Sequence, residues 1–433
     1  MKRKWDENAL PPGKDSSGKG GRQMKNRDSG DAVQSAYLLE YGRRRIRVYA
    51  DTFQNLAQIF AEDREEGADA EELSCRTQEE RQERAVLFLH KSLAKERKLF
   101  AGNLKEMADM MNRAAQESVR FIRLGSRRQR RLVRGLAGEG LTAREIYLVQ
   151  RGSGRMELSV LLSAKASRGR GVRTAEEAAG CLSVLLDMRL VSAKRNPFFI
   201  GEEPVCYFFE EEPEYVWLTG TARAVKETET VSGDNFAFFE AGDARLVLAL
   251  SDGMGSGGDA CRDSEAVMDM AESMLEAGLG AQMTVGLMNS ALSGEGSAQS
   301  LPTLDLCCLD LYEGECVFLK AGAAASFIKR GSAVERIAGA GLPLGACAGT
   351  PSQPVKRGVS DGDYIIMLTD GMTEGWPGGD GEKQIETLLS GMNGISPSEM
   401  AGILLRFAVE QRGGRIRDDM TVLCAGIWEK KTE

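Results

Sequence analysis

The chain has 433 residues, of which 42% are hydrophobic and 28% are charged. These proportions are ordinary for globular protein, and the length predicts two or three domains. No stretch approaches the ~18 consecutive apolar residues of a membrane-spanning helix, and the first residues lack the apolar core of a signal peptide. The nine cysteines are odd in number and none has Cys-x-x-Cys spacing, which argues against a disulfide framework or a cysteine zinc site. We therefore expect a cytoplasmic protein.

Charge is distributed unevenly along the chain. From residue 216 onward there are 17 basic and 31 acidic residues, a net charge of −14, which leaves +6 for residues 1–215. An acidic half suits divalent cations, and a basic half suits anionic surfaces. Most charged side chains only keep a surface solvated, so the imbalance alone identifies no partner, and we expect no nucleic acid.

The first 135 residues read as a tail followed by helices. Residues 1–40 are basic and rich in Gly, Ser and Pro, which predicts a disordered tail. Apolar residues at helical spacing predict a helical regulatory or linker region over 41–135, with helices at 45–62 and 83–134. The arginines between Arg123 and Arg134 leave a peripheral membrane contact open, and the long helices leave a homodimer open. A solvated face and an intramolecular core are the simpler interpretations.

The remainder of the sequence predicts two parts that differ in their arrangement of strands and helices. Residues 136–215 form a small α/β module with a helix at 174–188, and we find no catalytic constellation in it. Residues 216–433 have consecutive strands and paired helices, which predict the α+β class with antiparallel pairing. The expected strands include 246–250, 304–309, 316–320 and 364–368, and the expected helices are 261–277 and 282–292.

The strongest signal is a repeated Ser/Thr-Asp-Gly-Met sequence. Asp252 and Asp370 lie 118 positions apart, and each directly follows an apolar strand. A single Asp-Gly after a strand is usually a hairpin turn, but a second copy in the same context favours a shared site. A carboxylate at a strand end is held rigidly, and the adjacent glycine lets a backbone carbonyl approach the same point. Oxygen ligands of this kind suit Mg²⁺ or Mn²⁺.

Two further acidic sequences lie at predicted strand ends. Asp234 precedes the strand that ends at Asp252, and Asp418-Asp419 precedes the final strand. Either sequence alone is common in turns. Together, Asp234, Asp252, Asp370 and Asp418 would place four carboxylates at the ends of adjacent strands, where they would repel one another without a cation. The sequence therefore predicts a site for two metal ions.

These motifs resemble a known family. In chain order, Ser-Gly-Asp, Ser-Asp-Gly-Met-Gly-x-Gly, Thr-Asp-Gly-Met and Arg-Asp-Asp-Met-Thr-Val are similar to the metal-dependent PPM (protein phosphatase 2C type) phosphatases. Residues 319–331 and 341–345 are more similar to the stage II sporulation protein E type within that family. The resemblance covers about 220–427, and residues 45–215 resemble the regulatory segment of that type more weakly. The membrane region that precedes that segment in the family has no counterpart in these 433 residues.

The resemblance implies a fold, a reaction and roles. The fold would be a β-sandwich flanked by helices, preceded by the helical segment and the small regulatory module. Asp252 would bridge two Mn²⁺ or Mg²⁺ ions with the carbonyl of Gly253 as a further ligand, Asp370 and Asp418 would hold one ion, and Asp234 would support the other. Asp418 is preferred over Asp419 because the family uses the first acid of that turn. A water activated by the ions would attack the phosphorus of a phosphoserine or phosphothreonine protein.

The same resemblance implies a substrate and a regulatory device. The substrate would be a phosphoserine protein of the anti-anti-sigma-factor type, in the control of sporulation-specific transcription. The helices at 261–277 and 282–292 would move as a switch that completes metal binding when the amino-terminal region changes conformation. Core packing is the simpler explanation of the apolar stripes of these two helices.

Other classes of function remain as alternatives. The fold could serve as a non-catalytic binding or scaffold module, although all four aspartates are retained. Gly253, Gly255 and Gly258 satisfy a dinucleotide-binding pattern, but no second strand with a terminal acid follows about 20 residues later. The Cys-x5-Arg sequence from Cys75 lacks the glycines of a thiol-phosphatase loop. The single histidine, His90, excludes histidine chemistry in the carboxyl-terminal half.

Overall fold

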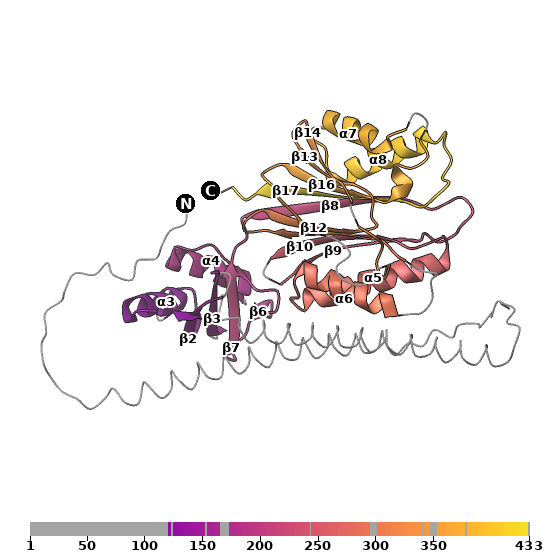
Figure 1. Cartoon of the computed structure of the whole chain (residues 1–433). Helices are drawn as coiled ribbons and strands as arrows, with labels where there is room; N and C mark the ends of the chain where they lie inside the picture. Colours follow the sequence, from indigo (N-terminus) through magenta and orange to yellow (C-terminus); the bar gives the residue numbers. More distant parts are fainter. Residues whose placement is uncertain are drawn as a thin grey trace, which may run out of the picture. The chain divides into compact units, whose positions relative to one another are not determined.

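The computed structural model describes residues 120–122, 124–151, 154–164, 173–242, 244–294, 301–339, 341–346, 353–376 and 379–431. All of these belong to the second of the two units into which the chain divides, residues 55–433. The tail, the helix at 45–62, most of the helix at 83–134 and the Cys75 motif lie outside the described residues. The described part is α+β, as predicted, with antiparallel sheets and flanking helices (Figure 1).

Residues 120–211, here called the small module, contain a five-stranded antiparallel sheet in the order β1-β2-β3-β7-β5. Two helices, α3 and α4, contribute Leu132, Leu136 and Leu182 to a core that includes Leu158 and Phe209 of the sheet. A short pair, β4 and β6, completes the module. The elements are β1 (Arg120–Ile122), α3 (Ser126–Gly138), β2 (Leu141–Gln150), β3 (Met156–Ala164), β4 (Arg173–Thr174), α4 (Ala175–Leu186), β5 (Leu190–Ser192), β6 (Phe199–Ile200) and β7 (Val205–Glu211).

The predicted helix over 83–134 is wrong at residues 120–122, whereas its last residues, from Ser126 onward, are helical as predicted. Residues 120–122 form strand β1, in which Ile122 pairs with Leu148, and a separate helix starts at Ser126. Ile122 fitted the helical spacing in sequence, but its long-range pairing with β2 decides its conformation. The predicted helix at 174–188 is confirmed as α4. Thr174 and Glu177 form a capping box that fixes where it starts.

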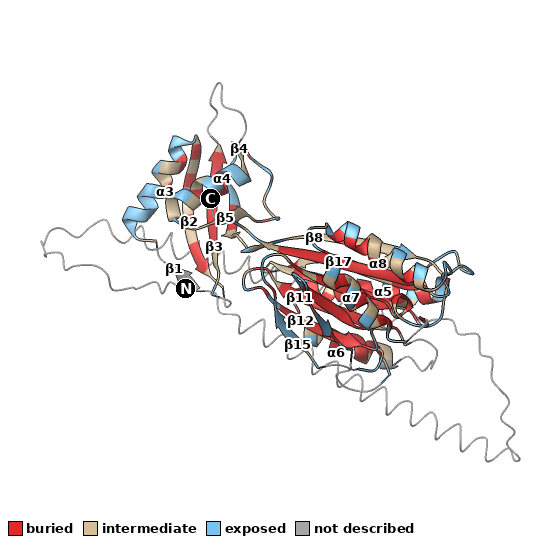
Figure 2. Cartoon of the chain, turned by 90° about the horizontal axis from the view of Figure 1, so that it is seen from above, coloured by how far each residue is buried: buried red, intermediate tan, exposed pale blue. Residues whose placement is uncertain are grey.

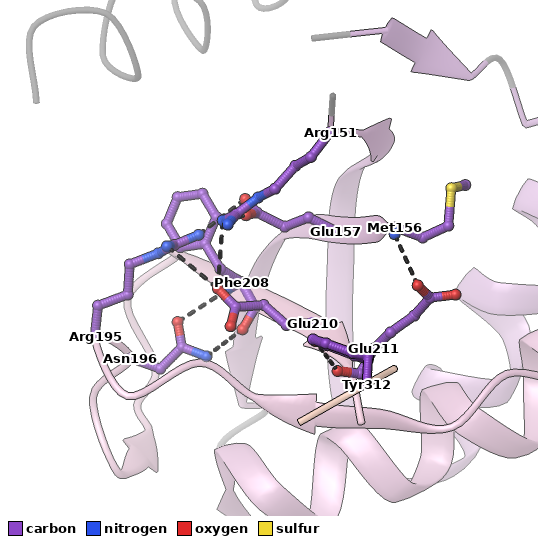
Figure 3. A network of polar contacts seen from close by, with 9 residues as sticks. All are labelled: Arg151, Met156, Glu157, Arg195, Asn196, Phe208, Glu210, Glu211 and Tyr312. Atoms are coloured by element: carbon purple, nitrogen blue, oxygen red, sulfur yellow. Dashed lines mark hydrogen bonds and ion pairs between the residues drawn. The ribbon is translucent and has the colours of Figure 1, made fainter. Parts of the chain in front are cut away.

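The face of the small module's sheet that points away from α3 and α4 carries buried charged side chains (Figure 3). Glu157 is 2% exposed and pairs with both Arg151 and Arg195. The Arg195 guanidinium also lies 4.1 Å from the ring centroid of Phe208. A buried carboxylate is costly unless it is paired, so two arginines around one glutamate keep this face stable. Alternate residues of β3, such as Leu158, face the helices instead.

Residues 215–429, here called the sandwich, contain two five-stranded antiparallel sheets in the orders β15-β12-β11-β10-β9 and β14-β13-β16-β17-β8. Leu248 of the first sheet shares one core with Met367 and Leu423 of the second. Figure 2 shows this buried layer as red strands. The strands are β8 (Tyr215–Ala224), β9 (Asp234–Ala241), β10 (Arg245–Asp252), β11 (Leu304–Asp310), β12 (Glu315–Ala321), β13 (Ser326–Arg330), β14 (Ala333–Ile337), β15 (Val355–Gly358), β16 (Asp363–Leu368) and β17 (Met420–Glu429).

Helices cover the outer faces of the sandwich (Figure 1). Helices α5 (Gly258–Glu276) and α6 (Ala281–Gly294) lie on the first sheet, close to their predicted bounds. Helices α7 (Gly381–Gly391) and α8 (Pro397–Gln411), which were not predicted, cover the second sheet. Within the described residues, no helix combines the length and apolar character needed to cross a membrane.

Candidate metal centre

The four predicted aspartates lie at strand ends on two different sheets. Asp252 ends β10 and stands directly opposite Asp234, the first residue of β9. Asp370 follows β16 and starts a short 3₁₀ helix, η1 (Asp370–Met372), while Asp418 lies two residues before β17. Strands β16 and β17 pair with each other at Leu368 and Val422, which brings the second pair of acids to one edge.

The charges of these aspartates act on one another. Partial burial, followed by the charges of Asp234, Asp370 and Asp418, raises the pKa of Asp252 to about 9. Burial is also the main cause that raises the pKa of Asp234 to about 6 and that of Asp418 above its ordinary value. The structure therefore brings the predicted residues close enough to repel one another, which a bound cation would relieve.

Hydrogen bonding leaves one oxygen of this cluster without a protein partner. The Oδ2 of Asp234 accepts a 3.0 Å hydrogen bond from the hydroxyl of Thr369, which links the two sheets. The Oδ1 of the same buried carboxylate has no partner in the described structure. A buried oxygen of this kind fits a divalent cation, which prefers carboxylate ligands. Among the described residues no three acidic, cysteine or histidine side chains already surround one point, so the ligand geometry stays a prediction.

Thr303, the residue before β11, holds the backbone of Asp252. The hydroxyl of Thr303 accepts a hydrogen bond from the Asp252 amide at 3.0 Å, and the Thr303 amide donates to the Asp252 carbonyl at 2.9 Å. The hydroxyl of Ser251 donates to the Thr303 carbonyl at 2.7 Å. These bonds fix the end of β10. Sequence reasoning missed Thr303 because no motif surrounds it and it lies about fifty residues away.

The two adjacent acids Asp418 and Asp419 have different surroundings. Asp419 is 4% exposed, and its two oxygens accept hydrogen bonds from the amides of Lys226 at 2.9 Å and Gly233 at 2.7 Å. Asp418 is half-buried, and one of its oxygens accepts a hydrogen bond from the Asp419 amide at 3.0 Å. Asp419 thus ties together the loops that carry Asp234 and Asp418. Because both oxygens of Asp419 already accept backbone hydrogen bonds, Asp418 is favoured as the metal ligand.

The glycine that follows Asp252 is required by close packing. A Cβ at Gly253 would lie 2.0 Å from the carbonyl oxygen of Ala260, in the first turn of α5. The Gly253 amide also donates to the Gly233 carbonyl at 3.1 Å. Only a glycine lets the Asp252 turn lie this close to α5, so the Asp-Gly sequence does more than form a hairpin turn.

We expect Gly253→Ala to lower both stability and activity. The added methyl group must displace backbone, which costs roughly 1–3 kcal/mol and corresponds to a loss of several degrees in melting temperature. Gly258→Ala is the matched control, because a Cβ at Gly258 meets no atom within 4 Å. Thermal unfolding of both variants checks this. Equal melting temperatures for the two would contradict the packing argument.

The dinucleotide-binding alternative is wrong. That fold requires parallel β-α-β units, whereas β10 pairs antiparallel with both β9 and β11, and every strand pairing described in the sandwich is antiparallel. The glycines of the pattern serve the turn and the start of α5 instead.

Comparison with known proteins identifies the family. The profile of the stage II sporulation protein E (SpoIIE) family matches residues 242–428. Stage II sporulation protein E of Bacillus subtilis is 30% identical over 353 residues, 79% of this chain and 41% of that protein. The protein of the same name from Priestia megaterium is 32% identical over 214 residues, 49% of this chain and 37% of that protein. The chain thus spans less than half the length of these relatives.

One solved structure supports the fold in particular. The PP2C phosphatase domain of B. subtilis SpoIIE, with a fragment of its regulatory domain, aligns with a TM-score of 0.58 over 82% of this chain and all of that one, at 24% identity. The antiparallel sheets and flanking helices of this chain match the fold of that structure. The carboxyl-terminal part of this chain is a SpoIIE-family domain of the PPM serine phosphatases, and the chain is homologous to B. subtilis SpoIIE over most of its length.

Proposed function

We propose that this protein is a metal-dependent phosphatase that hydrolyses phosphoserine or phosphothreonine in a protein substrate. The observation that carries the proposal is that four aspartates from two sheets lie close together, where burial and the charges of the other three raise the pKa of Asp252 to about 9. Family membership supports the reaction class. A scaffold without metal would have no use for charges that destabilise its own fold.

The four aspartates would have different roles in holding the metal ions. Asp252 would lie between two Mn²⁺ or Mg²⁺ ions with the Gly253 carbonyl beside it, while Asp370 and Asp418 would hold one ion and Asp234 would support the other. When bound, the ions would supply an activated water and offset the charge of the phosphoryl group. Thr303 keeps the backbone of Asp252 in place. No side chain of the chain needs to attack phosphorus.

A cleft beside Asp370 provides room for a substrate segment. It has a volume of about 480 Å³, and its wall is formed by small residues at 322–324 and by the loop at 373–376 with the start of α7. Glu374 contributes a carboxylate to this wall, and the nearby Asp370 charge, together with burial, raises its pKa. An extended peptide that carries phosphoserine could reach the aspartates along this cleft.

Activity that depends on added Mn²⁺ is the first expected result. The full chain should hydrolyse a chromogenic aryl phosphate and a phosphoserine protein in Mn²⁺, and a chelator should remove this activity reversibly. The enzyme and scaffold alternatives are separated by this measurement. A pure protein without Mn²⁺-dependent hydrolysis of either compound would overturn the proposed function.

The finer proposal concerns the substrate and its control. We propose a phosphoserine anti-anti-sigma factor as the substrate, which is the class that the resemblance of the sequence motifs to the stage II sporulation protein E type implies. Helix α5 packs against β9 and β10, the strands that carry Asp234 and Asp252, and α6 packs against α5 and β12, so a shift of this helix pair could reach the site through α5. Assay of candidate phosphoproteins with the full chain and with residues 1–215 removed tests both parts of the proposal.

A further inference from the structure

Behind the metal centre lies a buried ionic network. The ammonium group of Lys320 contacts the Oδ2 of Asp305 and donates to the hydroxyl of Ser326 at 2.8 Å. The same hydroxyl donates to the Oδ2 of Asp305. Lys320 is 3% exposed, Asp305 1% and Ser326 0%. Removing two charges from water this completely is costly, and an apolar set would often be at least as stable, so the network calls for a reason.

The position of the network supplies that reason. Asp305 on β11 stands opposite Leu250, two residues before Asp252, and opposite Lys320 on β12. Ser326 is the first residue of β13, in the other sheet. The network therefore joins the two sheets just below the strand ends that carry the candidate ligands.

A small cavity connects the network to the centre. It has room for about 10 Å³, close to the size of one water molecule, and Asp305 lines it together with Asp252, Asp370 and the two threonines Thr303 and Thr369. The Oδ1 of Asp305 is buried and accepts no hydrogen bond from any group described. A fifth carboxylate thus shares a cavity with two candidate metal ligands, and Lys320 is the cation that balances it.

We propose that Asp305 and Lys320 are positioning residues of the metal centre, which set its net charge and orient its ligands through the shared cavity. This inference rests on the proposed function, because it assumes that the aspartates bind divalent ions. Lys320 neutralises the charge of the fifth carboxylate, so that the net charge of the centre equals that of the four candidate ligands alone. Groups behind a metal ligand typically change metal affinity or activity by about 10- to 100-fold when they are removed.

The test is calorimetric titration of Mn²⁺ into the metal-free full chain. Asp305→Asn leaves the Lys320 charge unbalanced beside the centre and should weaken Mn²⁺ binding by about tenfold. Lys320→Met leaves the Asp305 charge unbalanced and should strengthen Mn²⁺ binding, while turnover falls because the site is misaligned. The double variant should return the dissociation constant close to that of the parent. A purely structural network would lower the melting temperature in both single variants and leave Mn²⁺ affinity unchanged.

The chain offers a matched control in Lys329→Met. Lys329 is a second buried lysine, 2% exposed, on β13, and it donates to the carbonyl of Gly331 outside the cavity. Its removal should leave Mn²⁺ affinity unchanged. If Lys320→Met does not fold, the nearly isosteric Asp305→Asn decides alone, and an unchanged dissociation constant overturns the inference. A parent protein that binds no Mn²⁺ would overturn the proposed function as well.

Discussion

Replacing Asp252 with Asn is expected to abolish activity and to make the metal-free protein more stable. Asn cannot supply the charge that two cations require, so turnover should fall by roughly a thousandfold, the equivalent of several kcal/mol of transition-state stabilisation. Asn also removes a charge that is unfavourable because of burial and of the neighbouring carboxylates, which together raise the pKa of Asp252 to about 9. Each ~1 kcal/mol relieved raises the melting temperature of a domain of this size by roughly 2–4 °C.

The stability effect has a defined pH dependence. The pKa of Asp252 is higher in the folded protein than its unfolded value of about 3.9, so the metal-free protein loses stability as pH rises from about 4 towards 9. The advantage of Asp252→Asn should therefore be larger at pH 8 than at pH 5 in the presence of a chelator. Thermal unfolding at the two pH values measures it. Asp259→Asn, on an exposed residue of α5, is the control and should show neither effect.

Asp418→Asn and Asp419→Asn are expected to fail in different ways. Asp418→Asn should remain folded but lose Mn²⁺ affinity and most activity, because it removes a proposed ligand. Asp419→Asn replaces a carboxylate that accepts hydrogen bonds from the amides of Lys226 and Gly233. Bonds to a charged acceptor contribute about 1.5–3 kcal/mol each, and Asn can accept only one of them. The melting temperature should therefore fall by several degrees.

Two measurements on this pair settle the assignment of the ligand. Calorimetry reports Mn²⁺ affinity, and thermal unfolding in a chelator reports the stability of the metal-free fold. Normal Mn²⁺ binding by Asp418→Asn, together with lost binding by a folded Asp419→Asn, would reverse the roles of the two residues.

The strand-end motifs were predictable because each one is local. Asp252 and Asp370 follow runs of apolar residues that must be buried strands, and the repeat itself indicates that the two ends meet. Strands β11 and β12 were predicted for the same reason, from two apolar runs on either side of a polar turn. The bounds of α5 and α6 followed from their apolar spacing.

The features that could not be predicted depend on pairing between distant residues. The pattern of apolar residues around Ile122 fits a helix as well as a strand. Only its pairing with Leu148 places it in β1. Lys320 ends a run of apolar residues, and nothing near it in sequence indicates that Asp305 balances its charge. Thr303 is one threonine among many until its bonds to Asp252 are seen. The choice between Asp418 and Asp419 likewise depends on the amides of Lys226 and Gly233, almost two hundred residues earlier.

The proposed metal centre would be assembled from both layers of the sandwich, since Asp234 and Asp252 lie at strand ends of one sheet and Asp370 and Asp418 at strand ends of the other. An ion held by acids of both layers would act as a reversible cross-link between them. The affinity for the ion would then depend on how closely the two sheets pack against each other. Truncating Leu248 or Met367, in the core that the sheets share, should weaken ion binding at the distant rim before it unfolds the protein.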